Sequence, residues 1–117
     1  MQYMLLIYED ETVYGDKHDS PAVMEIVQRH MAFGEGLGAA RKGGAGLVPT
    51  NMATTVVTRS GTQTVHDGPF AETREQLGGF VLIEAKDLND ALHVAAKIPP
   101  GRIGSIEVRP VWDLKQP

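Results

Sequence analysis

Two short apolar runs constrain the fold of this chain more than any other feature. Tyr3–Tyr8 and Phe80–Ala85 are rich in β-forming residues and contain almost no polar side chains. Runs of this length and composition are typical of buried central strands. Because successive side chains of a strand point to opposite faces, both faces of these two strands are apolar. A sheet that contains them therefore needs a cover on each side.

Two helices are predicted between and after these runs. Ser20 followed by Pro21 predicts a helix start, with Ser20 as the N-cap and Pro21 in the first helical position. Apolar residues then recur at steps of three and four, and the helix is expected to run towards Arg41. Asp87 predicts the cap of a second helix, which we expect to end at Pro99-Pro100-Gly101.

Further strands are predicted from shorter patterns. Leu47-Val48 is expected to be a short strand that ends at a proline. Thr54–Arg59 and Thr62–His66 are alternating runs rich in Thr and Val, and Ser60-Gly61 between them predicts a β-hairpin. Ser105–Trp112 is expected to be the last strand.

The order of these elements predicts an α+β fold with a single domain over residues 1–117. It is the ferredoxin-like β-α-β-β-α-β plan with an inserted β-hairpin. Both helices would cover one face of the sheet and leave the other face bare. A bare apolar face of this size predicts a homodimer with the sheets face to face, through Tyr3, Leu5 and Ile7 or the residues that alternate with them.

The composition excludes several classes of function. The chain has 117 residues, a net charge of −4 and no cysteine. The acidic balance argues against a nucleic-acid partner and against binding to an anionic membrane. Without cysteine there is no disulfide, thiolate nucleophile or cysteine-bound zinc. No apolar run approaches the roughly 20 residues of a membrane span. The first residues indicate a strand rather than a signal peptide, so we expect a cytoplasmic protein.

The stretch Asp67–Phe80 is the best candidate for a functional loop. It reads Asp-Gly-Pro-Phe-Ala-Glu-Thr-Arg-Glu-Gln-Leu-Gly-Gly-Phe. Asp-Gly-Pro cannot continue a helix or a central strand, since glycine is flexible and proline lacks a donor. Loops that carry acids, bases and amides on a rigid scaffold often bind ligands.

This stretch closely resembles the signature of the YCII-related family, in its DGPF-type branch. Further matching pieces occur at Tyr3–Tyr8, Gly46–Thr50, Ala53–Val56 and Ile106–Val111. The resemblance implies a ferredoxin-like dimeric α/β barrel. It also implies an enzyme, because members carry a characteristic His and Asp, although their reaction is not established. Members of this branch are often associated with extracytoplasmic-function sigma factors.

His30 and Asp67 are the candidate catalytic pair. His30 resembles the family histidine on the first helix. The family aspartate near the end of the second helix has no counterpart in Ala95–Pro99, so Asp67 would have to serve as the partner. The alternative for His30 is a structural role as a hydrogen-bonded core residue. The alternative for Asp67 is a hydrogen bond to the backbone of its own turn.

The candidate ligand-binding residues follow Asp67 in the same stretch. They are Glu72, Thr73, Arg74 and Gln76, and Arg74 is the expected anion binder because its fork matches a carboxylate. The alternative is a cluster of solvated charges. No histidine pair has the spacing of a helical zinc site, so we expect no metal and no cofactor.

Two functions remain open from the sequence. The first is a small cofactor-free enzyme of the lyase, isomerase or hydrolase type, which transfers a proton on a small anionic metabolite. The second is a non-catalytic dimeric module that binds a small ligand or regulates a partner, with a link to sigma factors. A third reading is a purely structural dimer whose signature loop locks the interface.

Overall fold

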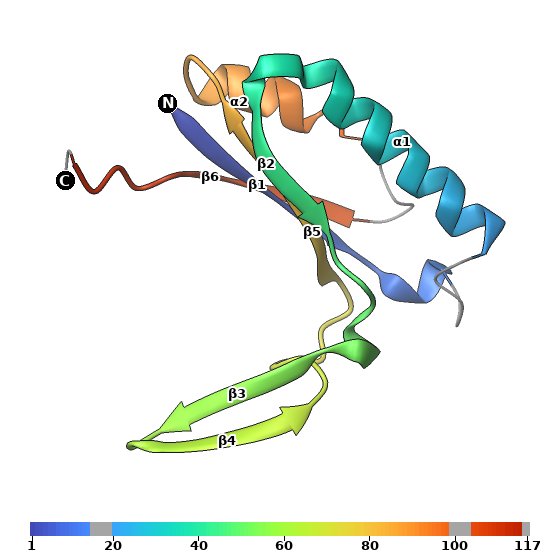
Figure 1. Cartoon of the computed structure of the whole chain (residues 1–117), viewed down its shortest axis with the longest axis vertical. Coiled ribbons are helices and arrows are strands. Elements are labelled where there is room, and N and C mark those ends of the chain that lie inside the picture. The colour runs from blue at the N-terminus through green and yellow to red at the C-terminus, as the bar shows by residue number, and fades with distance from the viewer. Residues whose placement is uncertain (15–19, 99–103, 116–117) are drawn as a thin grey trace.

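The computed structural model describes residues 1–14, 20–98 and 104–115, and shows an α+β fold (Figure 1). Its main sheet has the strand order β2-β5-β1-β6, and all neighbouring strands are antiparallel. The strands are β1 (Gln2–Glu9), β2 (Arg41–Gly46), β5 (Gln76–Glu84) and β6 (Gly104–Pro110). The predicted ferredoxin-like plan is confirmed by this order.

Two helices cover one face of the sheet, α1 (Pro21–Leu37) and α2 (Leu88–Ala95) (Figure 1). Both predicted caps are confirmed: Ser20 Oγ accepts from the backbone N–H of Val23 at 3.3 Å, and Asp87 Oδ1 accepts from that of Asp90 at 2.9 Å. The expected end of the second helix at residues 99–101 lies outside the described residues. No helix in the described ranges is long and apolar enough to cross a membrane.

The first helix ends earlier than predicted, and the second strand starts earlier. Gly38 has φ 56°, a left-handed conformation that suits glycine, and it ends α1 at Leu37. A 3-10 turn, Gly38–Ala40, then leads directly into β2. The other 3-10 turns are Glu11–Tyr14 and Thr50–Met52.

The prediction of a strand at Leu47-Val48 was wrong, since β2 occupies Arg41–Gly46, of which half is glycine. The strand lies where it does because glycines let two backbones approach closely. A Cβ at Gly44 would lie 2.7 Å from the carbonyl oxygen of Phe80, and a Cβ at Gly79 would lie 2.9 Å from that of Ala45. Pairing with β5 therefore outweighs the low strand propensity of this segment.

Strand β5 begins at Gln76 rather than at Phe80, and it contains a β-bulge. Ile7 pairs with Gly79, but the next residue of β1 pairs with Leu77, so Gly78 is an extra residue on β5. Part of the predicted loop is therefore strand. Bulges of this kind often re-aim side chains beside functional sites.

The inserted hairpin is confirmed and forms a sheet of its own. Strands β3 (Thr54–Arg59) and β4 (Thr62–Asp67) pair in antiparallel register. Ser60 and Gly61 have φ of 50° and 79°, the positive values that a tight hairpin turn requires. The hairpin projects away from the main sheet (Figure 1).

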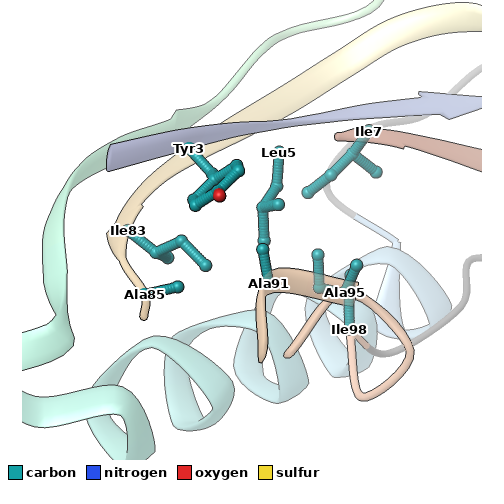
Figure 2. Close-up of a cluster of buried hydrophobic side chains, with 8 residues drawn as sticks. All are labelled: Tyr3, Leu5, Ile7, Ile83, Ala85, Ala91, Ala95 and Ile98. Carbon is teal, nitrogen blue, oxygen red and sulfur yellow. The ribbon is translucent and has the colours of Figure 1, made fainter. Parts of the chain in front are cut away.

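The core lies between the sheet and the helices (Figure 2). Tyr3, Leu5 and Ile7 of β1 point towards α2, and Leu5 and Ile83 are fully buried. These three β1 residues therefore belong to the core and not to the bare face. Of the two sets left open by the sequence, the alternating one faces away from the helices, with Met4 and Leu6 on β1 beside Leu82 and Phe80 on β5.

Candidate functional site

A cleft of about 790 Å³ lies between α1 and the part of the sheet formed by β2 and β5. We call it the α1 cleft. Its walls are mostly apolar, with Val23, Ile26 and Phe33 on the helix and Leu47, Val48 and Val81 opposite. The polar side chains along it are His30, Glu9, Glu11, Glu35 and Arg41. A mostly apolar hollow with a few polar groups is the usual form of a small-molecule site.

His30 lies on the face of α1 that lines this cleft, four residues after Ile26. Its Nε2 is shielded from solvent and has no hydrogen-bond partner among the described residues. An unpaired buried polar atom costs about 1–3 kcal/mol, so the fold does not keep it for stability. Burial lowers the pKa of His30 below its ordinary value of 6.5, and the negative charge of Glu9 opposes this shift. The ring is therefore neutral at neutral pH.

Glu9 is the carboxylate that the structure brings to His30. It ends β1 on the same face as Ile7, and it lines the α1 cleft. Its carboxylate lies beside the bulge, where a Cβ at Gly78 would touch Oε1 of Glu9 at 3.4 Å, an ordinary van der Waals distance. The negative charge of Glu9 favours the protonated form of His30. Glu9 would thus stabilise an imidazolium after the ring takes up a proton.

The signature loop, Asp67–Gln76, lines a second hollow of about 450 Å³, which we call the loop pocket. All the candidate residues of the loop contribute to it, namely Asp67, Glu72, Thr73, Arg74 and Gln76. Asp10 and Thr12, from the segment after β1, form the opposite side. The candidate loop residues therefore share one pocket, and within one chain it is not the pocket of His30.

Several polar groups of the loop are occupied by the loop itself. Nε2 of Gln76 donates to the carbonyl oxygens of Ala71 at 2.9 Å and Thr73 at 3.2 Å. The hydroxyl of Thr73 donates to the carbonyl oxygen of Glu75 at 2.7 Å. The amide of Gln76 and the hydroxyl of Thr73 therefore hold the loop in shape.

Arg74 is exposed, and it makes one contact with a buried carboxylate. Its Nε lies 3.5 Å from Oδ2 of Asp10, whose residue is only 6% exposed. Asp10 also accepts from Thr12, through the hydroxyl at 2.6 Å and the backbone N–H at 3.0 Å. These two hydrogen bonds, followed by Arg74, lower the pKa of Asp10 below its ordinary value of 3.8. Arg74 thus has one acidic partner within the chain, and most of its fork faces solvent.

Asp67 ends β4 and is exposed, and it lines the loop pocket. The turn after it is held by other groups: the N–H of Gly68 donates to the carbonyl oxygen of Ala53 at 2.7 Å, and the hydroxyl of Thr55 donates to that of Gly68 at 2.7 Å. Within one chain, His30 and Asp67 line different pockets. Glu11 lines both pockets, and its two oxygens accept from the N–H and hydroxyl of Thr50 at 2.8 and 2.6 Å.

Sequence reasoning missed Glu9, Asp10 and Arg41 as site residues. A signal for the first two was present, since Glu9-Asp10-Glu11 follows directly after a buried strand. Consecutive acids at such a strand end point to alternate sides and can serve two pockets. Arg41 was hidden because it was assigned to the end of the first helix. In the described part of the chain, no group of three or more acids and histidines is arranged to hold a metal ion.

Comparison with known proteins identifies the family. The chain matches the YCII-related domain over residues 1–115. It is also similar to an uncharacterized protein of Rhizobium meliloti (strain 1021), with 41% identity over 118 aligned residues that cover 95% of this chain and 92% of the relative. The match spans the α1 cleft, the hairpin and the loop pocket together. The chain belongs to the YCII-related family.

Proposed function

We propose that the protein is a small cofactor-free enzyme that binds a small metabolite in the α1 cleft and moves a proton with His30. One observation carries the proposal: Nε2 of His30 is buried and unpartnered among the described residues, beside a hollow of about 790 Å³. A bound molecule would supply the missing partner. Such a site suits a lyase, isomerase or hydrolase.

The electrostatics of the cleft support a general base. A neutral imidazole can accept a proton, and burial keeps His30 neutral at neutral pH by lowering its pKa. Glu9 would then stabilise the imidazolium that forms. A positioned acid or base of this kind typically contributes about 10²–10⁴-fold to a rate.

The test combines binding with the protonation state of His30. Wild-type protein, His30→Gln and the matched control His93→Gln, on the exposed side of α2, are screened against a metabolite library. ¹⁵N signals of the imidazole rings are followed during each titration. We expect ligands to shift the His30 signals, and we expect only His30→Gln to lose binding and turnover. Ligands that bind equally to His30→Gln would contradict the proposal.

A non-catalytic module for ligand binding or regulation, with a link to a sigma factor, is the second candidate. It is favoured by the separation of His30 and Asp67 into different pockets of one chain. Proton exchange separates the two candidates. A lyase or isomerase that works by proton transfer exchanges a C–H of its ligand with deuterium from heavy water, and a hydrolase cleaves its ligand, whereas a binding module leaves the bound ligand unlabelled and intact.

We also propose that the working form is a homodimer, in the manner of a dimeric α/β barrel. The chain exposes 8449 Å², whereas a compact monomer of 117 residues exposes about 6,200 Å². Its radius of gyration is 16.0 Å, against about 13 Å for a compact domain of this length. Half-buried Met4, Leu6, Phe80 and Leu82 share the face that no helix covers.

The dimer is tested by light scattering on three variants. Leu6→Asp should give a folded monomer, because a carboxylate on the bare face opposes association. Leu5→Asp should unfold the chain, since Leu5 is 0% exposed in the core. Thr58→Asp on the exposed hairpin is the control and should leave the mass unchanged. A monomeric wild-type protein at micromolar concentration would reject the dimer.

A further inference from the structure

Arg41 is a cation in the α1 cleft that the rest of the described chain does not neutralise. It begins β2 and lines the same cleft as His30. The ion pairs among the described residues join other groups: Met1 with Glu84, Arg29 with Glu25, and Arg74 with Asp10. A guanidinium has five N–H donors in a planar fork, and this geometry matches a carboxylate.

Two glycines make room for the Arg41 side chain. A Cβ at Gly34 of α1 would lie 3.2 Å from Nε of Arg41 and 3.4 Å from its Cδ, and nothing else is as near. A Cβ at Gly44 of β2 would lie 3.0 Å from its Nη2. The Arg41 side chain is exposed and therefore lies at the mouth of the cleft between helix and sheet, beside two residues that have no side chain. Larger residues at either position would displace it.

Gly34 also fixes the distance between Arg41 and His30. Gly34 and His30 are four residues apart on α1, so their Cβ positions are about 5–6 Å from one another on one face of the helix. The Arg41 side chain packs against Gly34, and the imidazole is that of His30. One small molecule can therefore contact both groups.

The cleft is electrically asymmetric along its length. The guanidinium lies level with Gly44, which pairs with Val81 of β5, whereas the Glu9 carboxylate lies beside Gly78. Three residues of strand separate these levels, which corresponds to about 10 Å. Among the described lining residues Arg41 is the only arginine or lysine, beside the acids Glu9, Glu11 and Glu35, so its fork is the group that can hold an anion, while the His30 and Glu9 end is where a proton can move. Between them the walls are apolar.

We infer that Arg41 anchors the carboxylate of a small acid with an apolar body, which lies in the α1 cleft and extends towards His30. The inference rests on the proposed function and names its substrate class. It also moves the anion-binding role from Arg74 to Arg41, because Arg74 already meets Asp10 and lines the other pocket.

The test uses pairs of fragments that differ only in charge. Fluorinated benzoate, phenylacetate and hexanoate are compared with their neutral amides by ¹⁹F NMR titration of the full chain. For the wild-type protein we expect at least one acid to bind about tenfold or more tightly than its amide, the effect of a charge-assisted hydrogen bond. Equal affinity within every pair, or no binding by any acid, would overturn the inference.

Two sets of variants show which residue causes the preference for an acid over its amide. Arg41→Gln should abolish it, Arg41→Lys should retain part of it, and Arg74→Gln should leave it unchanged. Gly34→Ala should weaken it by pushing the Arg41 side chain, whereas Gly36→Ala, which meets nothing within 4 Å, is the matched control on the same helix. A preference that survives in Arg41→Gln, or that disappears in Arg74→Gln, would overturn the inference.

The same titrations distinguish this inference from the proposed function. Amides that shift the His30 ring signals without any preference for acids would leave the proton-transfer site standing and reject the role of Arg41. Acids that bind through Arg41, in a protein that neither exchanges a C–H of any library ligand nor cleaves one, would support the anchor and reject the enzyme. A lower melting temperature for Arg41→Gln with an unchanged acid preference would show a structural role instead and would also overturn the anchor.

Discussion

The α1 cleft and the loop pocket lie on either side of the end of β1, and their polar groups are used in opposite ways. In the loop pocket, Gln76 and Asp10 have partners within the chain. In the α1 cleft, Nε2 of His30 has no partner among the described residues. Polar groups that are satisfied shape a structure, while a buried group that is left unsatisfied indicates a ligand.

This difference shows that the density of charged residues in a sequence is a poor guide to the site. The loop around Arg74 is the most conspicuous polar stretch of the chain, yet it spends much of its bonding capacity on itself. The cleft is lined mainly by aliphatic residues, and its chemistry depends on a few side chains from separate elements. Four sets of measurements test this difference between the α1 cleft and the loop pocket.

The largest effect is expected on activity in the α1 cleft. For a substrate that the wild-type protein turns over, His30→Gln should lower kcat about 10²–10⁴-fold, because the general base is lost. His93→Gln should have wild-type kinetics. The measurement is steady-state turnover together with a thermal melt. A large fall in Tm with unchanged ligand binding would instead identify His30 as a core residue.

The next effect is a loss of stability in the loop pocket. Gln76→Leu removes two hydrogen bonds to backbone carbonyls and should lower the free energy of unfolding by about 1–3 kcal/mol. Fragment binding in the α1 cleft should not change. Gln63→Leu on exposed β4 is the control for the added apolar group. If Gln76→Leu is as stable as that control, the loop is not held by its amide.

A smaller effect of opposite sign is expected when His30 is replaced by an apolar residue. His30→Leu removes the unpartnered Nε2 and adds apolar contact with the cleft wall, so the free energy of unfolding should rise by about 1 kcal/mol. Activity should disappear in the same variant. Urea denaturation of His30→Leu and wild-type protein measures the change. A clear loss of stability would mean that Nε2 has a partner in solution.

The smallest effects concern pH, and the two pockets should respond in different ranges. The pKa of His30 is below 6.5 in the folded chain, so the unfolded chain binds more protons just below that pH. Stability should therefore fall as pH drops from above 6.5 towards the folded pKa, and this component should be missing in His30→Gln.

Asp10 provides the corresponding test for the loop pocket. Its pKa is below 3.8 in the folded chain, so the stability that it contributes is present above 3.8 and is lost as pH falls through the folded value. Urea denaturation across pH should show this loss in wild-type protein and not in Asp10→Asn.

A His30→Gln profile identical to wild type near neutral pH would contradict the lowered histidine pKa.

Local chemistry was sufficient to predict much of the fold. Ser20 and Asp87 cap their helices, and Ser60-Gly61 turns the hairpin, because each depends only on neighbours in sequence. Strand β2 could not be predicted in the same way. Its sequence has little strand propensity, and it forms because the distant strand β5 pairs closely with its glycines.

The site residues also divide into those that local sequence predicts and those that depend on long-range pairing. His30 could be found from the sequence because a polar residue interrupts an apolar helical stripe. Its neighbour Glu9 could not, since the bulge at Gly78 that accommodates the carboxylate depends on long-range strand pairing. The partner expected instead, Asp67, belongs to the loop pocket. The pairing of strands and helices decides which charged groups come together, and spacing along the sequence does not predict that pairing.

The bulge at Gly78 also separates the register of the core from that of the loop end of β5. Gly78 has no partner on β1, and the pairs on its two sides, Ile7 with Gly79 and Tyr8 with Leu77, are complete without it. Loss of that residue would leave both pairs in register. A deletion between Phe80 and Glu84 would turn the following side chains to the opposite face and expose the core. The carbonyl of Gly78 accepts from the N–H of Leu47 at 2.9 Å, and Gly78 lies within the stretch that resembles the family signature, so we expect relatives to keep the bulge and with it the position of the cleft wall.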